Sequence, residues 1–183
     1  MGVALSYAAD NEERVASLTV GHGPGAPAPF ELGMMINMLA KVGVMRSSTA
    51  ALGAGPTIAF SVALGAIRHQ ANPTQIDDYK TAYAGRAFEF VHWFTDFHDK
   101  AAELAARVGN ITTPTQVFWG EHDVLFKPSN AQRLHDALPN SALRLLPDAG
   151  HLSWSDQPEM FAGMISDWVN SGHVECKKAG GNG

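Results

Sequence analysis

The sequence has little cysteine, no excess of positive charge and no long uninterrupted apolar run, and each absence narrows the class of protein. Its single cysteine, Cys176, cannot form an internal disulfide, so we expect a reducing compartment, the cytoplasm. The net charge of −5 argues against nucleic acid and against an anionic membrane as partners. Three glycines and a proline interrupt the most apolar stretch, 51–67, which therefore does not predict a membrane-spanning helix.

The composition that remains is typical of a folded domain with a core, since hydrophobic residues make up 45% and charged residues 17% of the 183 residues. In the last third, the sequence predicts a strand, a helix, a strand and a helix in turn, over 113–120, 128–140, 142–150 and 157–172. This alternation predicts an α/β fold with a parallel sheet and right-handed connections. An earlier β-branched run, 14–20, predicts another strand, preceded by a helix over 3–10.

Within these helices, particular residues are expected at the ends and on the buried face. We expect Ser129 to cap the helix over 128–140, in which Leu134 and Leu138 share one face. The intervening segment, 30–108, is mostly helical in composition and carries many of the methionine and aromatic residues. In the last helix, the residues expected on the inner side are Met160, Phe161, Met164, Ile165 and Trp168.

Asp123 and His151 each follow one of the strands predicted in the last third. Because the carboxyl ends of parallel strands meet at one edge of a sheet, the two loops should lie side by side. A carboxylate placed there accepts the Nδ1–H of an imidazole and fixes its tautomer. It also stabilises the imidazolium that forms when His151 takes a proton. The two residues are therefore our candidates for a catalytic acid–base pair.

The order of the motifs "TPTQVFWGEHD", "LPN", "GH" and "QPE" within residues 111–169 resembles the C-terminal part of an α/β-hydrolase of the esterase, lactonase and haloalkane dehalogenase kind. The resemblance implies that Asp123 is the acid and His151 the base of a catalytic triad. It also implies a small carboxylic ester as the substrate and a mainly helical cap over 26–108. Residues 1–25 and 109–172 then belong to the hydrolase core, and 173–183 form a polar tail.

The nucleophile of such a triad has no clear counterpart in the sequence. Residues 3–20 resemble the helix and strand that follow the family's G-x-S-x-G-G turn, in which the serine would lie five residues before Val3. No G-x-S-x-G occurs anywhere in the 183 residues. We therefore expect the C-terminal two thirds of a hydrolase, beginning just after its nucleophile.

Other serines are weak substitutes for that nucleophile. Ser6 would sit about 12 Å beyond the usual position along the helix. Ser153 and Ser155 flank the histidine loop, where a serine is expected to make local backbone hydrogen bonds. The remaining candidates, none of which lies in a strand-to-helix turn, are Ser47, Ser48 and Ser61.

Several residues are candidates for substrate contacts, and none is predicted to bind a metal. His22 follows the strand over 14–20 at the same sheet edge, and the other candidate contacts are Trp93, Phe94 and Leu152. The residues that a metal could use are His122, Asp123, His135 and His151. Their spacing matches no zinc-binding pattern, so no metal or cofactor is expected.

Two function hypotheses follow from these residues. The first is an esterase with an incomplete triad, in which water, another serine or a second chain replaces the missing nucleophile. The second is a folded, non-catalytic binding module. Under the first hypothesis, the strand over 14–20 is expected to be an exposed sheet edge, which predicts a homodimer that covers it.

Overall fold

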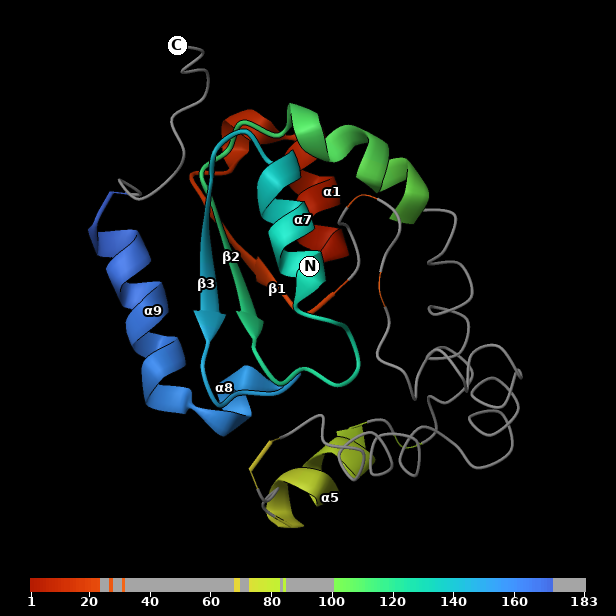
Figure 1. Ribbon diagram of the computed structural model, residues 1–183, viewed down its shortest axis with the longest axis vertical. Coiled ribbons are helices and arrows are strands. Elements are labelled where there is room, and N and C mark those ends of the chain that lie inside the picture. The colour runs from red at the N-terminus through yellow and green to blue at the C-terminus, as the bar shows by residue number, and fades with distance from the viewer. Residues whose placement is uncertain are drawn as a thin grey trace.

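The structure, a computed structural model, describes residues 1–23, 27, 31, 68–69, 73–82, 84 and 101–172. A parallel sheet of three strands lies at its centre, in the order β1 (Leu18–Gly21), β2 (Thr115–Gly120) and β3 (Ser141–Leu146) (Figure 1). Val117 of β2 pairs with Val20 of β1 and with Leu143 of β3. The predicted α/β class and parallel sheet are confirmed.

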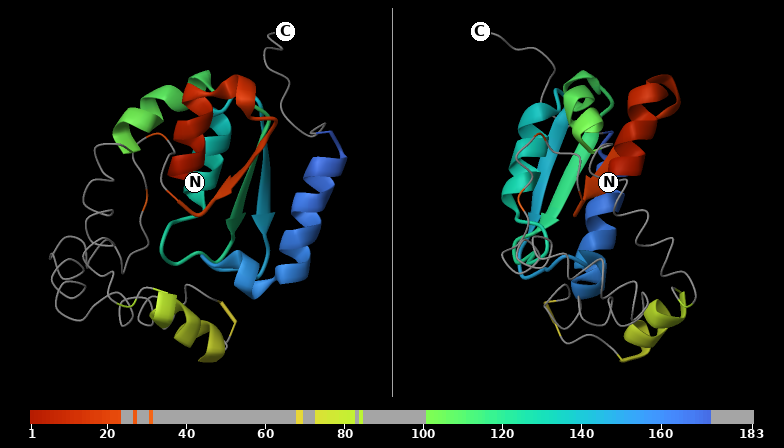
Figure 2. Two further views of the ribbon diagram at one scale, coloured as in Figure 1. Left: turned by 180° about the vertical axis from the view of Figure 1, so that it is seen from behind. Right: turned by 90° about the vertical axis from the view of Figure 1, so that its right-hand side faces the viewer.

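Helices cover both faces of this sheet. The helices α1 (Gly2–Asp10) and α7 (Ser129–Ala137) lie on one face, and α9 (Pro158–Asn170) lies on the other, as the two views of Figure 2 show. The other elements are the turns of 3₁₀ helix η1 (Glu12–Arg14) and η3 (Val108–Asn110), the single helical turn α8 (Ser153–Asp156), and the helix α5 (Pro73–Ala82), which has no buried residue. Residues 101–107 are also helical.

The main core fills the space between the sheet and the pair α1 and α7. Leu5 of α1, Val117 and Trp119 of β2 and Leu134 of α7 are fully buried in it. All six residues of β2 are buried, because helices lie on both of its faces. This agrees with the apolar run over 117–119, although the strand begins with two buried polar residues, Thr115 and Gln116.

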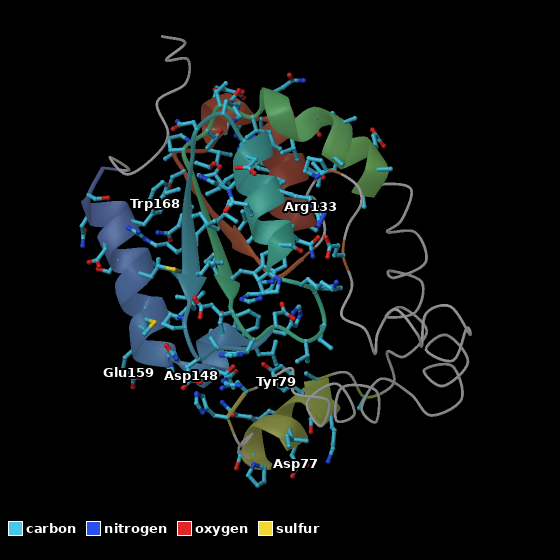
Figure 3. All side chains as sticks on the ribbon, in the orientation of Figure 1. Asp77, Tyr79, Arg133, Asp148, Glu159 and Trp168 are labelled. Atoms are coloured by element: carbon cyan, nitrogen blue, oxygen red, sulfur yellow. The ribbon has the colours of Figure 1, made fainter. Side chains whose placement is uncertain are left out.

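A second, smaller core lies under α9. Phe118 and Leu146 are buried there against Phe161 and Met164 of the helix, and the Trp168 side chain is also buried (Figure 3). Met160 is 45% exposed, so its predicted place on the inner side is wrong. It is the third residue of α9, and in this turn of the helix the neighbouring Phe161 packs against Phe118 instead.

Two further predictions are corrected at element ends. The strand expected over 14–20 is shorter, because Arg14 belongs to η1 and β1 begins at Leu18. Ser129 is the first residue of α7, after Pro128 at the cap position, and no side chain caps this helix. Among the described residues, no helix has both the length and the apolar character needed to cross a membrane.

Candidate active site

Three loops converge at the carboxyl edge of the sheet, one from each strand. His22 directly follows β1, Asp123 lies three residues after β2, and His151 lies five residues after β3. The loops after β2 and β3 are tied together by backbone hydrogen bonds from Glu121 N to Leu146 O, at 3.1 Å, and from His122 N to Ala149 O, at 3.0 Å. The parallel sheet thereby brings the three side chains to one place, as expected for the open edge of an α/β fold.

The Asp123 carboxylate is fully enclosed, and each of its oxygens has a separate set of donors. Oδ1 accepts hydrogen bonds from the backbone N–H groups of Leu125 and Phe126, each at 2.9 Å. Oδ2 accepts from Nδ1 of His151 at 2.9 Å and from Nδ1 of His22 at 3.0 Å. The carboxylate therefore sits where four N–H groups satisfy a buried negative charge.

His151 lies at the mouth of this group. Its side chain is 16% exposed, while that of Asp123 is 0% exposed. The ring stands edge-on to Phe126, with 5.1 Å between ring centroids. With Nδ1 bound to Asp123, the ring directs Nε2 away from the carboxylate, as a general base requires. The structure thus brings the predicted pair together, and its catalytic role stays a prediction.

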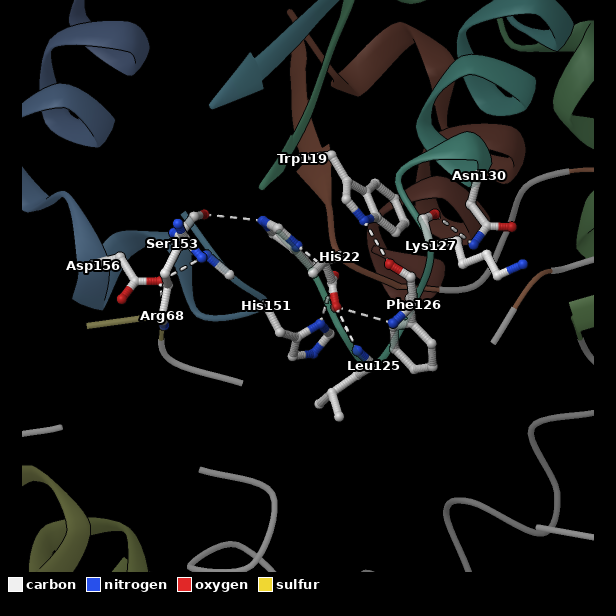
Figure 4. Close-up of polar contacts among 12 residues, drawn as sticks. His22, Arg68, Trp119, Leu125, Phe126, Lys127, Asn130, His151, Ser153 and Asp156 are labelled. Atoms are coloured by element: carbon white, nitrogen blue, oxygen red, sulfur yellow. Dashed lines mark hydrogen bonds and ion pairs between the residues drawn. The ribbon is translucent and has the colours of Figure 1, made fainter. Parts of the chain in front are cut away.

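His22 lies deeper than the sequence suggested. Its side chain is 2% exposed, and its ring packs against Phe118 and Trp119, at centroid distances of 5.2 and 5.3 Å. Nδ1 contacts Asp123, and Nε2 lies 2.9 Å from Oγ of Ser153 (Figure 4). Both ring nitrogens thus contact protein groups and not the solvent. The substrate contact expected for His22 stays a prediction.

Ser153, His22 and Asp123 therefore form a hydrogen-bonded Ser–His–Asp chain in the interior. This corrects the expectation that Ser153 makes local backbone hydrogen bonds, because its hydroxyl reaches a side chain 131 positions away. The serine is the first residue of α8 and is 0% exposed. The chain has the residue types and order of a catalytic triad, but its serine is shielded from solvent.

The charges of the site follow from its hydrogen bonds. Burial raises the pKa of Asp123, but hydrogen bonds from His151 and His22 outweigh this effect and lower the pKa to about 2. Burial lowers the pKa of His22, and the neighbouring Asp123 carboxylate offsets this only in part. An ionised Asp123 and a neutral His22 are therefore the forms expected near neutral pH.

Asp156 supports the histidine loop and was not singled out in the sequence. Its Oδ2 accepts the N–H of Gly150 at 2.7 Å and that of Arg68 at 3.1 Å, and its Oδ1 accepts the N–H of His69 at 3.0 Å. The carboxylate thus ties residues 68–69 to the loop that carries His151. In the sequence, Asp156 is only an acid that follows the histidine by five residues. Acidic residues are common near the start of helices, so this position alone does not indicate a functional role.

Within the part of the chain that the structure describes, three side chains lie close enough together to hold a metal ion. The donor atoms of His22, Asp123 and His151 lie within 4.8 Å of one another. Two imidazoles and a carboxylate suit zinc or iron, but Nδ1 of each ring already contacts the carboxylate, and a metal would replace both hydrogen bonds. His135, one of the residues weighed from the sequence, instead contacts Oγ of Ser141 at 2.9 Å.

The remaining candidates are spread over the chain. Leu152 is half-buried next to His151, directly before α8. Ser6 lies on α1 and Ser155 on α8, and both are partly buried. The others lie outside the described residues: Trp93, Phe94, Ser47, Ser48 and Ser61.

Comparison with known families identifies the class of protein. The model of the alpha/beta hydrolase fold family matches residues 2–158. The chain therefore belongs to the α/β-hydrolase family, as the sequence resemblance implied.

Similar proteins cover a range of named activities. A putative 2-succinyl-6-hydroxy-2,4-cyclohexadiene-1-carboxylate synthase of Bacillus subtilis is 35% identical over 68 residues, which is 37% of this chain and 24% of that protein. Monoacylglycerol lipase ABHD6 of Homo sapiens is 31% identical over 70 residues, or 38% of this chain and 21% of the lipase. The matches thus span about a quarter or less of these relatives.

Solved structures share the fold at low sequence identity. A putative lipase from Acinetobacter baumannii matches with a TM-score of 0.72 at 14% identity, covering 94% of this chain and 58% of the lipase. A thermophilic esterase from Thermogutta terrifontis matches with a TM-score of 0.60 at 20% identity, covering 94% of this chain and 62% of the esterase. The chain thus spans somewhat more than half the length of these structures.

Proposed function

We propose that the chain hydrolyses small carboxylic esters and that His151, oriented by Asp123, is the general base. The observation that carries this proposal is the 2.9 Å contact between Nδ1 of His151 and the ionised Asp123 carboxylate. It leaves Nε2 of a partly exposed ring to accept a proton. Two similar proteins are named as an esterase and a monoacylglycerol lipase, which supports an ester as the substrate class.

The proposed reaction uses water as the nucleophile. Nε2 of His151 takes a proton from water while the water oxygen bonds to the ester carbonyl carbon. The bond from that carbon to the alkoxy oxygen then breaks, and His151 returns the proton to the departing alcohol. Asp123 keeps the proton on Nδ1 throughout and stabilises the transient imidazolium. General-base assistance of this kind accelerates a reaction by roughly 10²- to 10⁴-fold.

The test is hydrolysis of p-nitrophenyl acetate and p-nitrophenyl butyrate by the wild type, His151→Ala and Asp123→Ala. We expect both variants to lose most of the activity. His135→Ala is the matched control, because His135 lies on α7 and contacts Ser141 instead of the site. It reports any unspecific reaction of imidazole with these activated esters. Equal rates in wild type and His151→Ala would refute the proposal and favour a non-catalytic binding module.

Ser153 is a second candidate for the nucleophile, favoured by its hydrogen bond to His22. In this alternative, Oγ of Ser153 bonds to the ester carbonyl carbon as its proton passes to Nε2 of His22. The bond to the alkoxy oxygen breaks, the alcohol leaves with that proton, and water then hydrolyses the acyl-enzyme to the acid and the free serine. Because Ser153 is 0% exposed, α8 would have to move before a substrate could reach it. A fluorophosphonate probe distinguishes attack by Ser153 from attack by water. Labelling that the substitution Ser153→Ala abolishes supports attack by Ser153, and an absence of labelling supports attack by water.

A further inference from the structure

The group around Asp123 contains one histidine more than the proposed reaction uses. The carboxylate Oδ2 accepts from Nδ1 of His151 at 2.9 Å and from Nδ1 of His22 at 3.0 Å. His22 is the more buried of the two rings, with 2% of its side chain exposed against 16% for His151. Oδ2 of Asp123 therefore has a second, enclosed histidine as a partner, and the proposed reaction gives this histidine no role.

When His22 is neutral, the protons between Asp123, His22 and Ser153 have one arrangement that satisfies every group. An ionised carboxylate only accepts, so Nδ1 of His22 must carry the proton that faces Asp123. In a neutral ring, Nε2 is then an acceptor, and it lies 2.9 Å from Oγ of Ser153. Ser153 therefore donates to His22, and His22 donates to Asp123. The donors of both hydrogen bonds of the His22 ring are thereby fixed.

The backbone of His22 shows that the ring is held in this place at a cost. Its φ is +48°, in the left-handed region that residues other than glycine rarely adopt. Such a conformation costs on its own and persists where the surroundings fix it, which is common at functional sites. Here Phe118 and Trp119 pack against the ring, and Trp154 stands edge-on to it at a centroid distance of 6.3 Å.

We propose that His22 is a positioning residue that holds the Asp123 carboxylate in place for His151. This inference rests on the proposed function, because it takes Asp123 and His151 as the acid–base pair. The two backbone N–H groups fix only Oδ1 of Asp123, so His22 is the group that fixes Oδ2 independently of His151. When the partly exposed His151 ring shifts or binds a proton, Oδ2 keeps one partner and the carboxylate stays aimed at Nδ1.

The first test observes the proton arrangement in the unaltered protein. In ¹⁵N-histidine NMR of the wild type near neutral pH, we expect His22 as a neutral ring with the proton on Nδ1 and a bare Nε2. His22→Asn assigns the signal among the eight histidines. A neutral ring with its proton on Nε2 would overturn the inference without any measurement of activity, because Nδ1 would then have no hydrogen to donate to Asp123.

The second test measures kcat and KM separately for two substitutions. His22→Asn keeps an N–H donor near the position of Nδ1 and tolerates a positive φ, whereas His22→Leu has no donor. We expect His22→Leu to lower kcat by roughly 10- to 10²-fold at nearly unchanged KM, as misplacement of a reacting group does. His22→Asn should restore most of kcat. A role limited to stability would lower the melting temperature and leave the kcat of the folded fraction unchanged.

The outcomes separate this inference from the proposed function. If His151→Ala matches the wild type, the proposed function fails, and the NMR result still decides the arrangement of His22. If His151→Ala is inactive while His22→Leu keeps full kcat, only the positioning role fails. If His22→Asn is as inactive as His22→Leu and Ser153 reacts with the fluorophosphonate, His22 is a base and the positioning role is overturned. If His22→Leu does not fold, His22→Asn decides, since it keeps a donor near the position of Nδ1 and removes the contact with Ser153. A fall in kcat that exceeds 10-fold in His22→Asn would contradict positioning by the Nδ1–H.

Discussion

At the scale of single residues, Asp123 places a buried negative charge at the centre of the site. Its pKa is lowered from 3.8 to about 2, so folding favours the ionised form. Such a group adds stability above its unfolded pKa and loses it as pH falls toward the folded pKa. A shift of this size corresponds to about 2 kcal/mol, in a window from about pH 4 to pH 2.

This predicts a difference in acid stability between the wild type and Asp123→Asn. The wild type should lose about 2 kcal/mol more than Asp123→Asn in its free energy of unfolding between pH 4 and pH 2, because the variant has no carboxylate to protonate there. Urea unfolding at several pH values measures the difference. Parallel pH profiles for the two proteins would show that Asp123 is not held as an anion by His22 and His151.

The sequence could predict part of this site and not the rest. Asp123 and His151 were recognisable because each follows a strand and lies in a motif that resembles the α/β-hydrolase family. The contact of Ser153 with His22 spans 131 positions, and no periodicity or motif connects the two residues. The depth of His22 was equally hidden, since its side chain is enclosed by Phe118 and Trp119 from another strand.

At the scale of elements, the close approach of the loops after β2 and β3 depends on Gly120. A Cβ at this position would meet the backbone carbonyl oxygens of Ala149 and Gly150, which cannot move away as a side chain can. The approach places the Asp123 loop against the loop of His151. Gly163, in the middle of α9, has open space around it instead. The two glycines therefore make a matched pair.

We predict opposite effects for alanine at these two positions. Gly120→Ala should lower the free energy of unfolding by about 1–3 kcal/mol, as overpacking does, and should reduce the proposed ester hydrolysis because the two loops separate. Gly163→Ala should raise it by up to about 1 kcal/mol, since alanine is the better helix former. Thermal and urea unfolding check both. A Gly120→Ala variant with unchanged stability would show that the loops are not packed as tightly as described.

The elements also show where sequence patterns are informative. The buried run of β2 and the 3.6-residue spacing in α7 and α9 predicted the existence and order of these elements, because burial dictates both patterns. Their ends were predicted less well. The start of β1 and the cap of α7 depend on the η1 turn and on Pro128, which are local backbone features that hydrophobic spacing does not encode.

At the scale of the whole molecule, β3 is one edge strand of the described sheet and β1 is the other. The strand β1 pairs with β2 on one side, and on its other side no strand is found among the described residues. An open strand edge offers unpaired backbone groups to another chain. We propose that a second copy of this chain covers the edge at β1, as expected from the sequence.

The corresponding measurement is the mass in solution. Size-exclusion chromatography with light scattering should give a mass near twice the 19.5 kDa of the single chain. A mass of one chain at micromolar concentration would rule out the dimer. This result would leave the site itself untouched, since His22, Asp123, His151 and Ser153 all come from one chain.

The most direct test of the proposed function is the ratio of kcat/KM between the wild type and His151→Ala on p-nitrophenyl butyrate. General-base catalysis by His151 predicts a ratio of at least roughly 10², with His135→Ala remaining at the wild-type value. A ratio near one would contradict it and leave the Asp123–His151 pair as a structural feature without a catalytic role.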